Sequence, residues 1–127
     1  MNVVDSSAWL EYFADGPNAA HFAEPIERPA KLIVPSITLL EVFKRVAAQR
    51  GEGPALQCVA LMQQGQVIDL DAALALSAAA LGRRHKLPLA DSVVYATAQQ
   101  HRAVVWTQDA DFDGLPEVCY WPRQPAA

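Results

Sequence analysis

The chain has 127 residues, of which 52% are hydrophobic and 19% charged, and its formal net charge is −4. This length suffices for one domain with a real core and is too short for two, and the composition is that of a globular rather than a disordered chain. No apolar run approaches the roughly 18 residues that a membrane span needs, and no basic leader precedes the first strand. We therefore expect a single domain over residues 1–123, a frayed tail over 124–127, and a cytoplasmic protein without a membrane partner.

The first half of the chain predicts two strands and four helices. A short apolar strand at residues 2–4 precedes a helix over 6–15, which Gly16-Pro17 ends. A shorter helix over about 18–28, a strand over 31–35 and an amphipathic helix from residue 36 follow, with Gly51 as the stop of that helix. Another helix is expected over 53–64.

The second half continues the alternation. A brief strand over 66–70 leads to a helix that begins after Asp71 and ends near "GRRHKL", where Pro88 breaks the chain. A helix over 89–101, a strand over 103–107, a turn-rich loop and an edge strand over 117–121 complete the order. Strands that alternate with helices predict an α/β fold with a mostly parallel central sheet.

Four acidic residues fall next to the ends of the predicted strands. Asp5 follows the first strand, Asp109 follows the strand over 103–107, and Asp91 lies at the start of the helix that feeds that strand. Glu41 lies in the helix after the second strand, a less direct link. Ligands of parallel sheets bind beyond the carboxyl ends of the strands, so we expect the four acids to converge on one edge of the sheet.

Each acid also has an ordinary structural explanation. Asp5 and Asp91 are good helix N-caps, and Thr38 with Glu41 has the spacing of a capping box. Glu41 could also be solvated and pair with basic residues further along its own helix. The aspartates of the loop over 108–114 are common turn residues. Only their shared location favours the hypothesis of a site.

A cluster of these acids would need a cation. Carboxylates within a few ångströms repel one another, and some take up protons unless a cation neutralises them. A pocket of oxygen ligands without histidine or cysteine suits Mg²⁺ or Mn²⁺. Such an ion activates water and stabilises charge on phosphate, so the cluster favours hydrolysis of a phosphodiester.

Four segments carry a resemblance to a known family. The segments "NVVDSSAWLEYF", "PSITLLEV", "LPLADSVVYATA" and "VVWTQDADF" appear in the order and with the spacing of the PIN domain, specifically that of the VapC-type toxins of VapBC toxin–antitoxin systems. The resemblance runs over nearly the whole chain. It implies a flavodoxin-like three-layer α/β/α sandwich and an endoribonuclease that depends on Mg²⁺ or Mn²⁺.

The resemblance also assigns roles to individual residues. It implies catalytic roles for Asp5, Glu41, Asp91 and Asp109, with Asp5, Asp91 and Asp109 as the metal ligands. It implies supporting roles for Ser6, Thr107 and Asp111.

Basic residues near the acids are candidate contacts for RNA phosphates. Two groups lie close to the acids in sequence, one around "GRRHK" and one on the helix of Glu41: Arg83, Arg84, Lys86, Lys44 and Arg45, with Arg50 on the same helix. Each of them could equally be a solvated cation near the end of a helix.

The resemblance implies two protein partners. One is a VapB-type antitoxin whose tail blocks the acidic pocket, and the other is a second copy of the chain, so that a homodimer or a hetero-oligomer with the antitoxin is expected. Trp9, Leu10 and Phe13 are candidate groove residues for the antitoxin, although ordinary core packing explains them as well.

Other functions stay open at this point. A metal-independent ribonuclease could use His85 or His101 as a general base, although neither lies beside a clear nucleophile. Phosphoryl-aspartate chemistry would need a paired aspartate or an Asp-x-Asp after a strand, which "VVDSS" and "VVWTQD" do not supply. A catalytically inactive binding module of PIN-like fold is the remaining alternative.

Overall fold

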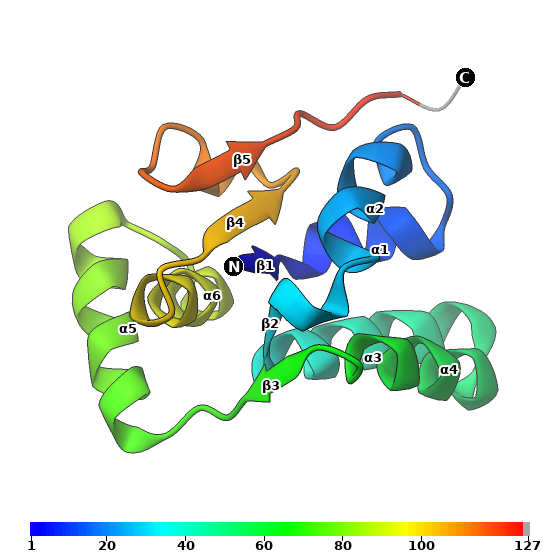
Figure 1. Cartoon of the computed structure of the whole chain (residues 1–127), viewed down its shortest axis with the longest axis horizontal. Coiled ribbons are helices and arrows are strands. Elements are labelled where there is room, and N and C mark those ends of the chain that lie inside the picture. Colours follow the sequence, from blue (N-terminus) through cyan, green and yellow to red (C-terminus); the bar gives the residue numbers. More distant parts are fainter. Residues whose placement is uncertain (126–127) are drawn as a thin grey trace.

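Five parallel strands form the central sheet of the computed structural model, which describes residues 1–125 (Figure 1). Their order is β3-β2-β1-β4-β5, and every neighbouring pair is parallel. The strands are β1 (Asn2–Val4), β2 (Leu32–Pro35), β3 (Gln66–Ile68), β4 (Val104–Thr107) and β5 (Val118–Tyr120). The predicted α/β class is confirmed, and β5 lies at an edge as expected, although several strands are shorter than predicted.

Helices cover both faces of the sheet. They are α1 (Ser6–Phe13), α2 (Ala19–Ile26), α3 (Ser36–Arg50), α4 (Glu52–Met62), α5 (Ala72–His85) and α6 (Leu89–Gln100), with short 3-10 helices at Pro29–Lys31 and Ala110–Phe112. Figure 1 shows α5 and α6 on one side of the sheet and α1 to α4 on the other. The three-layer arrangement implied by the family resemblance is therefore confirmed.

Successive residues of each strand face opposite layers. Val4 packs with Trp9 of α1 and Phe22 of α2, whereas its neighbour Val3 packs with Val94 of α6. This alternation follows from the two-residue period of a strand. Because both faces of β1 are covered, Val3 and Val4 are buried, and the first acid comes where the strand ends, at Asp5.

Local signals for helix ends are met in two places. Gly51 ends α3 with a φ of +93°, a conformation that glycine adopts at little cost. Asp71 caps α5, because its side chain accepts a hydrogen bond of 2.8 Å from the backbone N–H of Leu74.

The strand order creates a crevice at the carboxyl ends of the central strands. The chain leaves β1 towards β2 on one side, and β4 lies on the other side. The backbone N–H of Asp5 donates to the carbonyl of Trp106 at 2.9 Å, which joins the ends of β1 and β4. Parallel sheets bind ligands where the strand order reverses in this way.

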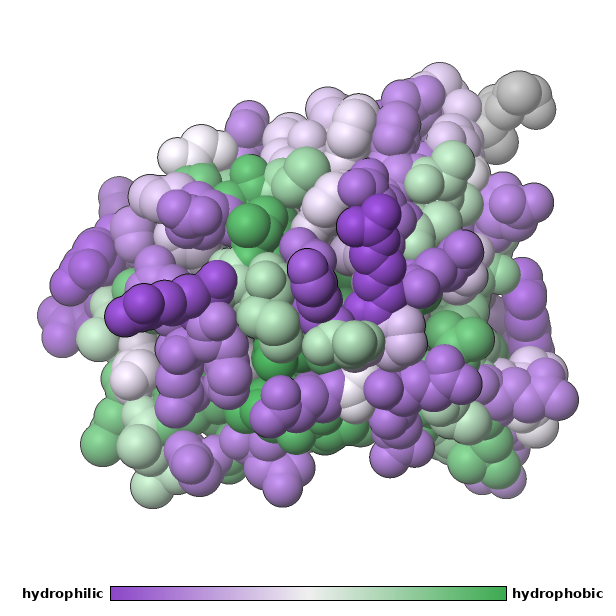
Figure 2. Space-filling view, in the orientation of Figure 1, coloured by the Kyte–Doolittle hydropathy of each residue, from purple (hydrophilic) through white to green (hydrophobic). Residues whose placement is uncertain are grey.

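The surface and the end of the chain add little to the site. Hydrophilic side chains cover most of the face shown in Figure 2, with apolar patches between them. Within residues 1–125, no helix combines the length and the apolar character that crossing a bilayer requires. Residues 124 and 125 are exposed and lie outside helices and strands, and the rest of the predicted frayed tail lies outside the described residues.

Candidate active site

Asp5 is buried where β1 meets α1, with only 1% of its surface exposed. Its Oδ2 accepts hydrogen bonds from the hydroxyls of Ser7 at 2.7 Å and Thr107 at 2.9 Å. Burial raises the pKa of Asp5, and these two hydroxyls oppose that rise. Asp5 occupies the N-cap position of α1 as predicted, but its side chain makes none of the hydrogen bonds of a helix cap.

Ser7, not the predicted Ser6, provides the serine hydroxyl that binds Asp5. The Ser6 side chain instead forms a hydrogen bond that lowers the pKa of Glu41. Consecutive side chains of a helix point about 100° apart, so two neighbouring serines serve different acids. The motif "DSS" contains both residues, but the sequence alone cannot tell their directions apart.

Thr107 connects the first and the last of the four acids. Its hydroxyl donates to Asp5 and accepts a hydrogen bond of 2.9 Å from the backbone N–H of Asp109. The Oδ1 of Asp109 in turn accepts the backbone N–H of Asp111 at 2.9 Å. This last bond makes the loop a tight turn, so the turn-residue explanation of these aspartates is also true, and it holds both of them beside the sheet edge.

Two buried amide side chains extend the network, and the sequence analysis missed both. The backbone N–H of Gln108 donates to the Ser7 hydroxyl at 3.3 Å, and its side-chain oxygen accepts Nδ2 of Asn18 at 3.1 Å. Asn18 also donates to the carbonyl of Pro122 at 2.8 Å. Gln108 lies beside Asp109 in sequence, which was a usable signal, whereas Asn18 offered none.

Glu41 points into the same crevice, is half-buried, and is not a cap residue. Its Oε1 is buried and has no hydrogen-bond partner within residues 1–125. Burial, followed by the charges of Asp5 and Asp109, raises the pKa of Glu41. The capping box is wrong because α3 begins after Pro35, and the Thr38 hydroxyl donates to the Pro35 carbonyl at 2.7 Å.

Asp91 lies where burial and several negative charges act together. The pKa of Asp91 rises to about 8 through burial first and then through the charges of Asp5, Asp109, Asp111 and Glu41. The N-cap of α6 is Pro88, so Asp91 is within the first turn and does not cap the helix.

The side chains of Asp91, Asp109 and Asp111 can present one oxygen each, all within 4.8 Å of one another. This set differs from the predicted ligands in one respect, because Asp111 joins it while Asp5 lies outside it. Oxygen ligands alone fit a hard cation such as Mg²⁺ or Mn²⁺. The unpartnered oxygen of Glu41 and the raised pKa of Asp91 are both the signs of a site that lacks positive charge.

The predicted RNA-binding residues separate into two regions. Arg45 lines a groove beside Ser7 and Gln108, and Lys44 is exposed on the same helix. Arg83 and Arg84, by contrast, line surface depressions formed with α6, and Lys86 is exposed at the end of α5. Of these five residues, the structure therefore places only Arg45 in the groove that Ser7 and Gln108 line.

The predicted antitoxin-binding residues also separate. Trp9 is 1% exposed and belongs to the core, so its side chain is not available to a partner. Leu10 and Phe13 are half-buried and line the same groove as Arg45.

Both candidate histidines have structural contacts. His85 packs edge-on against Tyr95 with 5.6 Å between ring centroids, and Nδ1 of His101 lies 2.9 Å from the carbonyl of Thr97. These contacts account for the two rings without a role in catalysis.

Comparison with known proteins agrees with this fold. Residues 3–118 match the PIN domain. The chain belongs to the PIN domain family. A comparison with curated proteins finds no significant match to this sequence.

Solved structures from three bacteria superpose closely on the chain. A toxin–antitoxin complex from Klebsiella pneumoniae has a TM-score of 0.81 at 24% identity, covering 97% of this chain and 100% of its own. VapC20 from Mycobacterium tuberculosis, described as a sarcin-ricin loop cleaving toxin, has a TM-score of 0.77 at 17% identity over 93% and 97%. VapBC2 from Rickettsia felis, bound to promoter DNA, has a TM-score of 0.72 at 12% identity over 95% and 97%. At these identities the likeness establishes the fold.

Proposed function

We propose that this PIN domain is a metal-dependent endoribonuclease that acts as the toxin of a toxin–antitoxin pair. The observation that carries the proposal is an acidic cluster in want of a cation: three aspartate oxygens within 4.8 Å of one another, beside a buried glutamate oxygen without a partner. A structural ion-pair network would have supplied basic partners for these acids. The catalytic residues in this proposal are Asp5, Glu41, Asp91 and Asp109.

The chain's own residues hold the charges in place. Asp91, Asp109 and Asp111 would bind Mg²⁺ or Mn²⁺, which when bound supplies an activated water and a positive charge beside the phosphate. Burial and the charges of Asp5 and Asp109 raise the pKa of Glu41, which suits this carboxylate to accept a proton from an attacking water. Hydroxyl donors from two elements fix Asp5, whose charge helps to attract the cation.

RNA as the substrate and an antitoxin as the partner are supported by the fold neighbours. One of them is described as a sarcin-ricin loop cleaving toxin, and two others are a toxin–antitoxin complex and VapBC2. In our proposal an antitoxin of VapB type covers the groove that Leu10 and Phe13 line, and the protein works in the cytoplasm. The strongly exposed Leu76 (74%) and Leu89 (78%) are candidates for the contact with a second copy of the chain.

The test is cleavage of a mixed RNA panel by the purified protein in Mn²⁺, in EDTA, and by Asp91→Asn in Mn²⁺. We expect cleavage only by the wild type with metal, because the substitution removes a ligand and leaves the fold intact. Cleavage that survives both EDTA and the substitution would refute the metal mechanism. If neither protein cleaves while both bind an antitoxin-like partner, the chain is a binding module instead.

A further inference from the structure

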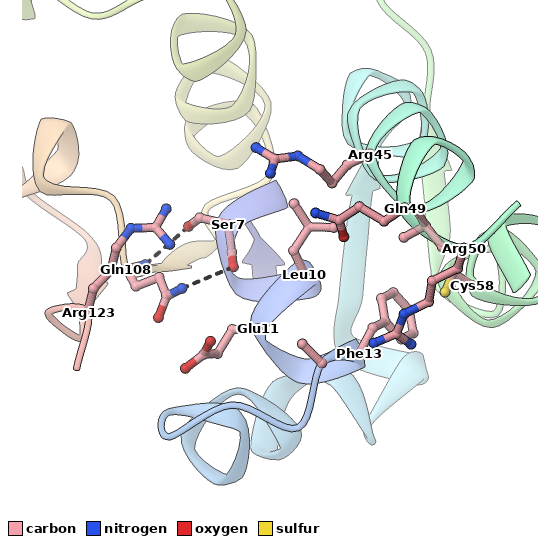
Figure 3. Close-up of a pocket in the computed structure, with 12 residues that line it drawn as sticks. Ser7, Leu10, Glu11, Phe13, Arg45, Gln49, Arg50, Cys58, Gln108 and Arg123 are labelled. Carbon is pink, nitrogen blue, oxygen red and sulfur yellow. Dashed lines mark hydrogen bonds between the residues drawn. The ribbon is translucent and has the colours of Figure 1, made fainter. Parts of the chain in front are cut away.

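A groove leads away from the acidic crevice between α1, α3, α4 and the segment that follows β5 (Figure 3). Its volume is about 240 Å³. Ser7 and Gln108 line one end of it, and both belong to the hydrogen-bond network that holds Asp5. This end of the groove is therefore separated from Asp5 by one hydrogen-bonded residue, Ser7.

Three arginines line this groove, and they come from two separate parts of the chain. Arg45 and Arg50 project from α3, and Arg123 comes from the segment after β5. Figure 3 shows the side chains of Arg45 and Arg123 on either side of the end that holds Ser7. The chain has only 10 lysines and arginines and a net charge of −4, so three arginines around one groove are a local reversal of its overall charge.

The acid that lines the groove does not cancel this charge in full. The Oε2 of Glu11 accepts a hydrogen bond of 2.8 Å from the backbone N–H of Asn18, so its carboxylate is already engaged in ordering the loop after α1. One glutamate against three arginines leaves the groove with a positive surplus. Such a surplus favours an anionic ligand.

The lining of the groove also includes apolar side chains. Leu10, Phe13 and Val46 line it together with the arginines. The ring of Phe13 is stacked on Trp9 with 5.7 Å between centroids and 18° between planes, so a buried neighbour holds it in place. A groove that combines cations with an aromatic side chain is the kind of surface on which proteins bind single-stranded nucleic acid.

We propose that this groove binds a single-stranded segment of the RNA next to the bond to be cut, with the phosphates on Arg45, Arg50 and Arg123 and a base over Phe13. The inference rests on the proposed nuclease function and adds the path of its substrate. An acidic cluster by itself repels RNA, and arginines beside it offset that repulsion where the strand enters. The basic residues of "GRRHK", the other group that the sequence analysis named, lie on the layer of α5 and α6 and are outside this path.

The experiment measures binding of a labelled single-stranded oligoribonucleotide to Asp91→Asn protein in Mg²⁺, so that cleavage does not interfere. In this background we expect Arg45→Gln, Arg50→Gln and Arg123→Gln each to weaken binding about 3- to 10-fold and to reduce the slope of log affinity against log salt by about 0.7. The matched controls Arg83→Gln and Arg84→Gln remove the same charge elsewhere. We expect these controls to change affinity less than about 2-fold.

Two results would overturn the inference. One is a set of groove variants that bind the oligoribonucleotide like the parent; the other is an equal loss in the controls, which would show only an effect of net charge. If the first result comes with a loss of binding to an acidic peptide, the groove serves only the antitoxin of the proposed function.

Failure of the nuclease proposal is distinguishable. If RNA binding depends on the groove arginines but the wild type never cleaves RNA, the inference stands and the nuclease proposal is refuted. If metal-dependent cleavage is unchanged by substitution of all three arginines, the nuclease proposal stands and the inference is refuted.

Discussion

Asp5 and Asp91 are two acids of one crevice with opposite surroundings. Asp5 is nearly inaccessible, yet its Oδ2 accepts two hydroxyl hydrogen bonds, from Ser7 and Thr107. Asp91 is half-buried, and every neighbour that perturbs it is another acid. The protein itself stabilises charge on the first acid, whereas the second depends on a proton or a cation.

This difference indicates that the two acids have different roles, Asp5 in the structure of the site and Asp91 in binding a cation. A carboxylate that hydroxyls satisfy is a fixed part of the scaffold, and removing one donor leaves a buried acceptor without its partner. Carboxylates that only repel one another store unfavourable free energy, which a metal ion releases on binding. The predictions below test the two halves of this comparison.

The largest effect is expected on RNA cleavage, from a substitution of Glu41, whose Oε1 has no hydrogen-bond partner in the described part of the chain. Glu41→Gln keeps the size of the side chain but cannot take up a proton, so we expect RNA cleavage to fall by at least about 100-fold. Initial rates in Mn²⁺ measure this, with Glu52→Gln, an exposed glutamate of α4, as the control that keeps full activity. Normal cleavage by Glu41→Gln would remove Glu41 from the catalytic set.

Loss of a hydrogen bond to Asp5 should lower the stability of the protein. Thr107→Val removes the hydroxyl that donates to Asp5 and accepts from Asp109, so we expect the free energy of unfolding to fall by about 1–3 kcal/mol. Urea unfolding in EDTA measures it. Thr97→Val is the matched control, since that hydroxyl donates only to the Val93 carbonyl within α6, and we expect it to cost less than about 1 kcal/mol. Equal losses would mean that the contacts of Asp5 are not special.

Metal binding should stabilise the folded protein. At ten times its dissociation constant, Mg²⁺ or Mn²⁺ stabilises by about 1.4 kcal/mol, which corresponds to an increase of about 5 °C in the melting temperature. Asp91→Asn lacks a ligand and should show a much smaller increase. Thermal melts with and without millimolar metal decide this, and a wild type whose melting temperature ignores both ions would contradict the proposed site.

The smallest effect concerns the metal-free protein and pH. The folded protein keeps a proton on Asp91 up to about pH 8, whereas an unfolded chain releases it near the ordinary value of 3.8, so the wild type loses stability as the pH rises between these values. Asp91→Asn should flatten that decline and be about 1 kcal/mol more stable than wild type at pH 8, because solvent screens a half-exposed group. The two proteins should be equally stable at pH 4. A wild-type stability that rises over this range in EDTA would contradict the repulsion between the acids.

The periodicity and the turn residues of the sequence were enough to predict the order of elements and the α/β class. Apolar runs marked the strands, and Gly51 and Asp71 ended and began helices where expected. The short strands were overestimated, because residues next to a strand share its apolar character without sharing its hydrogen bonds. The four acids could be placed near strand ends for the same reason, since their position is a matter of local order along the chain.

What the sequence by itself determined was therefore one-dimensional: which residues form strands and helices, and which acids follow them. Only the tertiary structure decided which neighbours those acids have. Ser7 rather than Ser6 reaches Asp5 because of the direction in which a helix projects its side chains. Asn18 reaches Gln108 across 90 residues because the segment after α1 packs against the residue that follows β4. The arginines of the groove come together for the same reason, since packing of distant segments is a property of three-dimensional arrangement that no local pattern records.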